Sequence, residues 1–158
     1  MSTSKVHFSV PGHRSASVGY EEPFEMLDAC HERVQRMLDL LTRLRNHVAK
    51  NGCDVQANDA AVDVMRYFDL AAPLHHQDEE LHVFPAVLAM RNDQLDLLVL
   101  RLRQEHLEME NLWCQVRLAL ARVEQENANT KVPFSQAELA CMDAFVAIYI
   151  NHIRSEEG

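Results

Sequence analysis

Two histidine–glutamate pairs lie within the short stretch HHQDEELHVFP, residues 75–85. His75 is paired with Glu79, and His76 with Glu80, each pair being four residues apart. Residues at this spacing lie one turn apart on the same face of an α-helix, so each pair presents an imidazole beside a carboxylate. Both groups bind divalent cations such as iron, zinc and manganese. The stretch therefore predicts a metal site on one helix face.

The apolar pattern upstream of this stretch indicates which pair points into the protein. An apolar series with helical spacing precedes it, and His75 and Glu79 continue that series. The series consists of Ala61, Met65, Phe68 and Ala72. His76 and Glu80 lie about 100° further round the helix. We therefore predict His75 and Glu79 as inward ligands, and His76 and Glu80 as side chains that support the ligands or face solvent.

Three further histidines occupy equivalent places in other helical segments. His31, His106 and His152 lie on or beside apolar stripes, and Glu156 follows His152 at the same spacing of four. Four imidazoles and two carboxylates are too many ligands for one tetrahedral zinc ion. They suit two six-coordinate cations that share both carboxylates and leave positions open for an outside ligand, and iron fits this ligand set. Burying the carboxylates without cations would be unfavourable by several kcal/mol each.

Two other polar residues lie close to these candidates in the sequence. Glu105 directly precedes His106, and we expect it either to accept a hydrogen bond from a ligand or to face solvent. Tyr149 lies one turn before His152, so its hydroxyl could reach the metal pocket or simply form the polar tip of a core residue.

Four long amphipathic helices are predicted to position these residues. Their expected limits are Pro23 to Gly52, a cap at Asn58 or Asp59 to Pro85, Asn92 to the loop ENANTKVPFS, and a capping box at Ser135 to the end of the sequence. Pro73 should kink the second helix just before His75. Helices of this length with short connections predict an all-α fold, an antiparallel up-down four-helix bundle over residues 23–158. Residues 1–22, rich in serine, predict a flexible N-terminal arm or a flap.

The net charge and the absence of sequence signals limit the partners and the compartment. A net charge of −9 argues against nucleic acid and against an anionic membrane surface as partners. No apolar run reaches the ~20 residues that span a bilayer, and the N-terminus has no secretory signal. The four cysteines form no C-x-x-C pair and are expected to be free thiols. We therefore expect a cytoplasmic protein, whose oligomeric state the sequence leaves open.

These motifs resemble those of the hemerythrin-like proteins, the family of HHE cation-binding domains. The matching stretches are LDACHERV, HHQDEELHVFP, QEHLEME and NHIRSEE, in this order within residues 23–157. The resemblance implies a four-helix bundle around a non-haem di-iron centre with an oxo or hydroxo bridge. Carried over by position, it assigns His31 and His75 to one iron, His106 and His152 to the other, and Glu79 and Glu156 as bridges. Zinc or manganese could occupy the same ligands.

The chain departs from the oxygen-carrying members of that family in two helices. Where their third helix has H-x-x-x-H, this chain has Glu110 at the second position, and where their fourth has H-x-x-x-x-D, it has H-x-x-x-E. Both changes resemble the bacterial iron-centre-repair proteins and the iron-sensing domains. One iron then lacks an imidazole unless Glu110 supplies a carboxylate. Glu156 falls in the last turn, so either metal orders this end or the site is partly disabled.

Three functions follow from this resemblance as hypotheses. The first is a non-enzymatic protein that binds oxygen or nitric oxide at a carboxylate-bridged di-iron centre, for sensing, storage or stress response. The second is an iron-donating repair protein, or an oxidoreductase acting on nitric oxide or peroxide. The third is a helical interaction module that its metal stabilises. Turnover with a reductant or transfer of iron would indicate the second, and bound metal that ignores oxygen would indicate the third.

Overall fold

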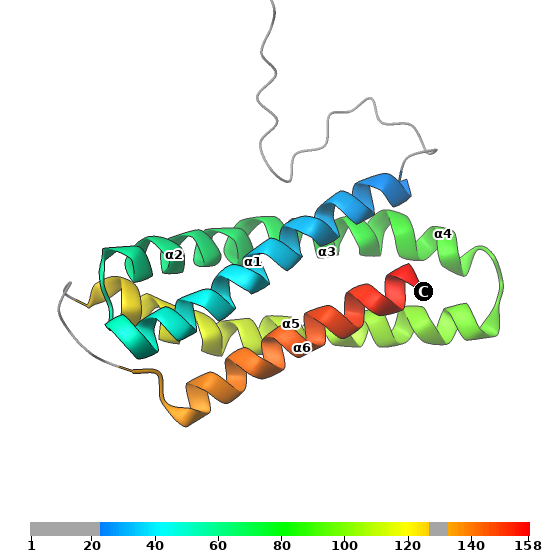
Figure 1. The fold of residues 1–158 in the computed structure, drawn as a ribbon. Helices are drawn as coiled ribbons and strands as arrows, with labels where there is room; N and C mark the ends of the chain where they lie inside the picture. Colours follow the sequence, from blue (N-terminus) through cyan, green and yellow to red (C-terminus); the bar gives the residue numbers. More distant parts are fainter. Residues whose placement is uncertain (1–22, 127–132) are drawn as a thin grey trace, which may run out of the picture.

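A computed structural model describes residues 23–126 and 133–158, with the side chains of residues 23–26 left out. The described residues form four helical rods and no β-strand. The rods are α1 (Pro23–Asn51), a composite rod over residues 55–88, α5 (Asp93–Gln125) and α6 (Gln136–Glu157). Successive rods run in opposite directions, which confirms the predicted antiparallel up-down bundle (Figure 1). In the described ranges, no helix is both long and apolar enough to cross a membrane. The predicted arm, residues 1–22, lies outside them.

Side-chain caps begin the last two rods where the sequence predicts them. Asn92 caps α5, and its side-chain oxygen accepts hydrogen bonds from the backbone N–H groups of Gln94 and Leu95. Ser135 and Glu138 form the predicted capping box of α6, each side chain accepting a hydrogen bond from the other's backbone N–H. These local bonds satisfy donors that have no partner within the helix.

The first helix of the composite rod begins earlier than predicted. Asp54, rather than Asn58 or Asp59, caps α2 (Val55–Arg66), and its carboxylate accepts a hydrogen bond from the Ala57 N–H at 2.9 Å. Gly52 has a φ of 74°, a left-handed conformation that glycine adopts freely. This conformation ends α1 and turns the chain, so that a cap becomes possible only two residues later.

Two wide π-helical turns interrupt the composite rod, and each precedes a proline. They are η1 (Tyr67–Ala71), which leads into α3 (Ala72–Asp78) with Pro73, and η2 (Glu79–Val83), which leads into α4 (Phe84–Leu88) with Pro85. The prediction that Pro85 ends the helix was therefore wrong, because α4 continues to Leu88. A wider turn relieves the clash between a proline ring and the preceding turn, so the helix can continue through both prolines.

The predicted apolar stripes meet in a main core along the bundle axis, and a smaller second cluster contains Phe84, Val99 and Leu102. Four aromatic rings pack at the centre of the main core, with the centroids of Phe68 and Phe145 4.9 Å apart and those of Phe68 and Tyr149 5.4 Å apart, and Trp113 completes the group. On α6 the most buried residues are Met142, Phe145, Tyr149 and His152. That face includes His152, so the helix turns this predicted ligand toward the core.

Candidate metal centre

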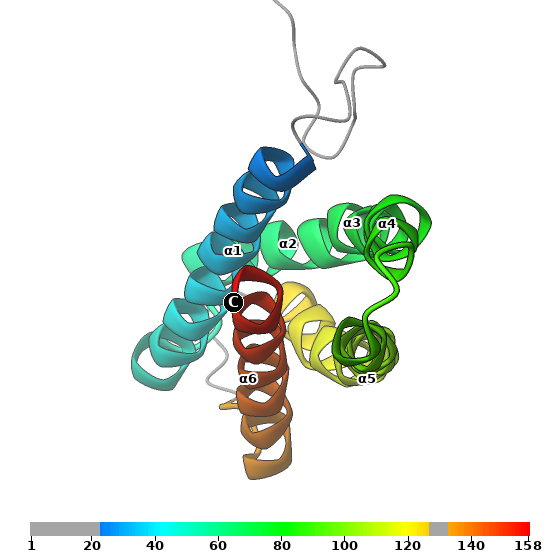
Figure 2. The same cartoon turned by 90° about the vertical axis from the view of Figure 1, so that its right-hand side faces the viewer.

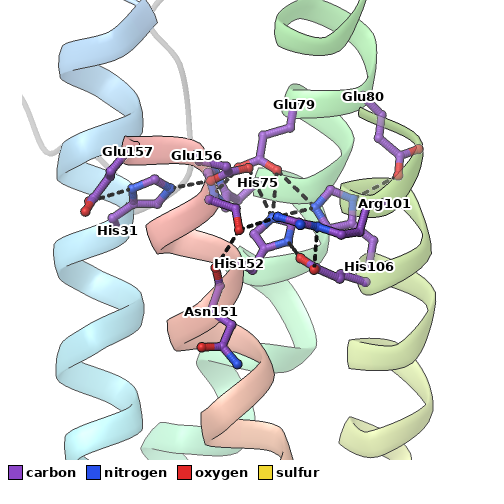
Figure 3. Close-up of polar contacts among 12 residues, drawn as sticks. His31, His75, Glu79, Glu80, Arg101, His106, Asn151, His152, Glu156 and Glu157 are labelled. Carbon is purple, nitrogen blue, oxygen red and sulfur yellow. Dashed lines mark hydrogen bonds and ion pairs between the residues drawn. The ribbon is translucent and has the colours of Figure 1, made fainter. Parts of the chain in front are cut away.

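All six side chains predicted as metal ligands come together between the four rods (Figure 3). Among the described residues three groups of side chains could each hold a cation; the most exposed contains Asp28, His31 and Glu157, and the other two share Glu79. Of these two, one contains His31, His75 and Glu79, and the other contains Glu79, His106, His152 and Glu156. Glu79 is only 1% exposed, and the other five are buried or nearly so. The bundle therefore concentrates six donors in a space shielded from water.

The two carboxylate oxygens of Glu79 face different histidines. Oε1 lies 2.7 Å from Nε2 of His75. Oε2 lies 3.0 Å from Nε2 of His106 and 3.6 Å from Nε2 of His152. One carboxylate thus connects the imidazole from the composite rod with the pair of imidazoles from α5 and α6.

Glu156 repeats this arrangement from the last turn of α6. Its Oε2 lies 2.7 Å from Nε2 of His31, and its Oε1 lies 3.1 Å from Nε2 of His152. The glutamate is nevertheless well shielded, with a side chain 5% exposed. Both carboxylates therefore present one oxygen to the side of His31 and His75, and the other to the side of His106 and His152.

One buried oxygen at the centre has no hydrogen-bond partner. Oε1 of Glu79 is inaccessible to solvent and accepts no hydrogen bond within the described residues, although Nε2 of His75 lies 2.7 Å away. The orientation of the ring does not direct a hydrogen bond at this oxygen. An unsatisfied buried carboxylate oxygen is unfavourable unless a cation neutralises it. The donor set therefore fits a bound metal cation better than an ordinary core.

The charges of these groups are strongly coupled. Burial, the largest influence, opposes ionisation of Glu79, but the nearby imidazoles of His106, His152 and His75 hold the pKa of this carboxyl well below its usual range. Burial likewise disfavours the protonated form of His152, yet Glu156 and Glu79 raise the pKa of His152 to about 10. In the absence of metal, the Glu79 carboxylate is therefore ionised and attracts protons to the surrounding imidazoles.

Carboxylates behind two of the histidines hold their rings from the outer side. Nδ1 of His152 lies 2.7 Å from Oε2 of Glu105, and Nδ1 of His106 lies 2.9 Å from Oε1 of Glu80. A carboxylate on Nδ1 fixes the ring orientation and leaves Nε2 free to bind metal. Glu105 thus has one of its two predicted roles, while Glu80 supports a histidine of another rod.

The outer partners of the other two histidines were not predicted. Nδ1 of His31 lies 3.2 Å from Oε1 of Glu157, the residue after Glu156. Burial opposes protonation of His75, but Cys30 and then Glu79 raise its pKa to about 10. The sequence contains only one signal for these two residues, which is that each lies next to a predicted ligand. Cys30 directly precedes His31, and Glu157 directly follows Glu156.

The second pair of the HHQDEE stretch, together with Phe84, encloses the ring of His106. The His76 ring stacks on that of His106, with centroids 4.1 Å apart and planes 14° apart, and the Phe84 ring lies 5.7 Å away at 19°. His76 and Phe84 are eight residues apart, about 12 Å along a helix, so the imidazole lies between them. Burial, and then the charge on His106, lower the pKa of His76 to about 2, so the ring is neutral. His76 is buried, so it does not face solvent.

The remaining two candidates, Glu110 and Tyr149, belong to none of the metal-capable groups of the described residues. Glu110 is exposed. Tyr149 is buried with its ring 5.9 Å from that of His76, and burial raises the pKa of its hydroxyl. The structure thus gives the side of His106 and His152 no carboxylate from Glu110.

Comparisons with known proteins agree with this geometry. The chain matches the family model described as the hemerythrin HHE cation binding domain over residues 22–158. A protein from Haemophilus influenzae, described as uncharacterized, is 29% identical over 138 residues, which cover 87% of this chain and 76% of that protein. Both matches extend over most of the chain, and the family match contains all six donors.

Proposed function

Since the chain belongs to the hemerythrin family of HHE cation-binding domains, we propose that it is a non-haem di-iron protein that binds oxygen or nitric oxide in sensing, storage or stress response. In this proposal His31 and His75 hold one iron, and His106 and His152 hold the other. Glu79 and Glu156 bridge the two ions. Zinc or manganese could bind the same donors, since imidazole and carboxylate ligands accept several divalent metals.

One observation carries this proposal: both carboxylates divide their oxygens between the same two imidazole pairs. The shortest nitrogen–oxygen distances are 2.7 Å on the side of His31 and His75, and 3.0 Å on the other. Each side thus offers two imidazole nitrogens and two carboxylate oxygens. A metal with six coordination positions would keep room for a small outside ligand, which is the chemistry that such a centre supplies when it is loaded.

The protein's own residues would keep that ligand position selective. The buried aromatic group of Phe68, Phe145 and Tyr149 closes the core below the centre. Glu105 and Glu80 hold His152 and His106 in the orientation that directs Nε2 inward. Apolar walls with few polar groups favour small uncharged ligands over ionic ones, because an ion would lose its hydration without compensation.

Release of iron to an acceptor is a second candidate function, and the position of Glu156 favours it. This bridging carboxylate lies in the last turn of α6, and Glu157, the outer partner of His31, is half exposed. An exposed carboxylate holds an imidazole less firmly than a buried one, because water competes for the same hydrogen bond. The ion beside His31 would therefore leave first, which suits an iron donor.

The experiment that tests these functions is metal analysis paired with optical spectroscopy on anaerobically purified protein. We expect two irons per chain and a near-ultraviolet charge-transfer band that changes when oxygen or nitric oxide is added. Protein that neither contains iron nor takes up ferrous iron would contradict the proposal. A centre that ignores both gases would indicate a purely structural metal, and transfer of iron to a metal-free acceptor would favour the second candidate.

The contacts around His106 give a prediction for one side of the centre. Replacing Glu80 by glutamine should weaken binding of the ion held by His106 and His152 about 10- to 100-fold, because the ring of His106 loses the carboxylate that orients it. The ion held by His31 and His75 should be retained, since the histidine that Glu80 contacts among the described residues is His106. Stepwise metal titration against a competing chelator would measure both affinities.

His82 provides the matched control for this variant. It lies on the same composite rod as Glu80 and is exposed. His82→Gln should leave both affinities unchanged, and equal weakening of both ions by Glu80→Gln would contradict a role confined to His106.

A further inference from the structure

A second apolar stripe runs along α5 on the face opposite the core. Its residues are Leu97, Leu100, Gln104, Leu107, Asn111, Cys114 and Leu118, separated alternately by three and four positions. All seven are exposed, and the four leucines are 55–73% exposed. The buried face of the same helix carries Val99, Leu102, His106 and Met109, among others. The stripe therefore contributes nothing to the core or to the metal centre.

The repeat of this stripe is that of a coiled coil. Alternating steps of three and four average 3.5 residues, the period at which one helix face stays turned toward a partner helix. In heptad terms, Leu100, Leu107 and Cys114 occupy d positions. The a positions are Leu97, Gln104, Asn111 and Leu118. Figure 2 shows α5 at a corner of the bundle, with no described helix covering its outer side.

We propose that this stripe is the interface of a homodimer, in which α5 packs in parallel and in register against α5 of a second copy. Exposed leucines at regular heptad spacing over three heptads bury apolar area only when a second helix covers them. A second copy supplies an identical stripe of identical length. The proposal is independent of the metal centre, because the donors lie on the opposite face of α5.

The layers of this interface favour parallel helices in register. In that arrangement each residue meets its own copy, so leucine packs on leucine, while the amides of Gln104 and Asn111 each meet an identical amide. An antiparallel arrangement would place Leu100 against Asn111 and Leu107 against Gln104, which buries amides against apolar side chains. Buried amides without partners are unfavourable, and an asparagine pair at an a position is an established device for fixing register.

The flanking charges are compatible with the same arrangement. Residues at g positions approach e positions five residues later on the partner helix. Arg103 would then face Glu108 of the second copy, whereas Arg101 donates a hydrogen bond to Ser155 of α6 in its own chain at 2.6 Å. Glu110 would face the uncharged Gln115. Arg117 would face Arg122 of the second copy, but Asp69 and Glu138 neutralise these two guanidinium groups within each chain, so the flanking charges do not oppose self-association.

The composite rod carries a shorter group of exposed leucines, which serves as an internal comparison. Leu70, Leu74 and Leu81 are 49–63% exposed. They span 12 residues, with Leu70 in η1, Leu74 in α3 and Leu81 in η2, so no three-heptad repeat develops there. A partner helix would therefore find fewer regularly spaced apolar side chains on this rod than on α5.

Sedimentation velocity over a concentration series, on the full chain, tests the interface. We expect a reversible dimer for the unmodified protein. Leu107→Glu and, independently, Leu118→Glu should raise the dissociation constant at least ~100-fold, because two like charges would be buried opposite each other. Both leucines are exposed, so helical circular dichroism should be retained. Leu81→Glu is the matched control and should leave the dimer intact.

A monomeric unmodified chain at all concentrations would overturn the proposal, and so would a dimer that Leu81→Glu dissociates while Leu107→Glu does not. Monomeric behaviour would mean that another occupant, such as the segment before Pro23 or a different protein, covers the stripe. Neither result would affect the metal analysis described above, so the failure of one proposal is distinguishable from failure of the other.

Cys114 tests the orientation of the helices. In register and parallel, the two Cys114 side chains meet at one d layer, whereas in the antiparallel arrangement they lie about 25 Å apart. Diamide should therefore join two chains, its azo group taking up the two electrons and two protons that the thiols lose as the disulfide forms. Cys114→Ser should abolish this product. A dimer in solution that diamide does not join through Cys114 would overturn the parallel register.

Discussion

Replacing Glu79 by glutamine should remove both metal ions from the protein rather than one. The reason is geometric, since Oε1 faces His75 and Oε2 faces His106 and His152. Glutamine has a single oxygen and a hydrogen-bearing nitrogen that cannot bind a cation, so neither position keeps its bridge. We expect metal content to fall from two ions per chain to nearly none after dialysis, as measured by mass spectrometry of the metal.

Glu110→Gln is the matched control, because Glu110 is exposed and lies outside the metal-capable groups of the described residues. It should retain both ions. Circular dichroism should show that Glu79→Gln still forms the bundle, so that metal loss reports on the donors and not on unfolding. Retention of one tightly held ion by Glu79→Gln would contradict a shared bridge, and loss of an ion from Glu110→Gln would make that residue a ligand.

The metal-free protein should be most stable near pH 6.5 and should lose stability on both sides of that value. The pKa values of His75 and His152 are raised to about 10 in the fold. A histidine with a raised pKa stabilises the fold fully when the pH is below 6.5, its pKa in the unfolded chain. This contribution disappears as the pH rises toward 10. Since each pKa unit corresponds to about 1.4 kcal/mol, the alkaline loss should reach a few kcal/mol.

Two groups govern the acid side of the profile. The pKa of His76 is lowered to about 2, so the unfolded chain binds a proton below pH 6.5 that the folded chain does not, and stability falls. Glu79, whose pKa lies well below its unfolded value of 4.5, adds a further loss under pH 4.5. Urea unfolding of metal-free protein at several pH values would measure the free energy of unfolding across this range.

Metal loading should remove the alkaline decline, because cations replace the protons on the ligands. At pH 8 loading should release about two protons per chain, from His75 and His152, and His31, whose pKa is also raised, would add to this number. Titration in unbuffered solution would count them. Two results together would contradict protonated imidazoles around Glu79. The first is metal uptake without proton release, and the second is a free energy of unfolding of the metal-free protein that does not change between pH 6.5 and 9.

The sequence predicted the fold and the neighbourhood of the site because both depend on local periodicity. Apolar residues spaced by three and four fix which face of each helix is buried, and His31, His75 and His106 lie on those faces. The residues that begin a helix are also recognised from local sequence, as the capping box at Ser135 shows. The cap of α2 was predicted at the wrong residue because the conformation of Gly52 decides where the next helix can begin. The assignment of the six donors as ligands stays a prediction, which the variants above test.

Tertiary structure alone decided which atoms face each other. Periodicity says that Glu79 points inward, but only the packing of four rods places its two oxygens against different histidines. The outer contacts of Glu80 and Glu157 are likewise made between rods, so no spacing within one helix could reveal them. The position of Phe84 beside His106 depends on the π-helical turn at residues 79–83, which changes the angle between successive side chains. The sequence by itself therefore determined which residues meet, and the packing of the rods determined which of their atoms do.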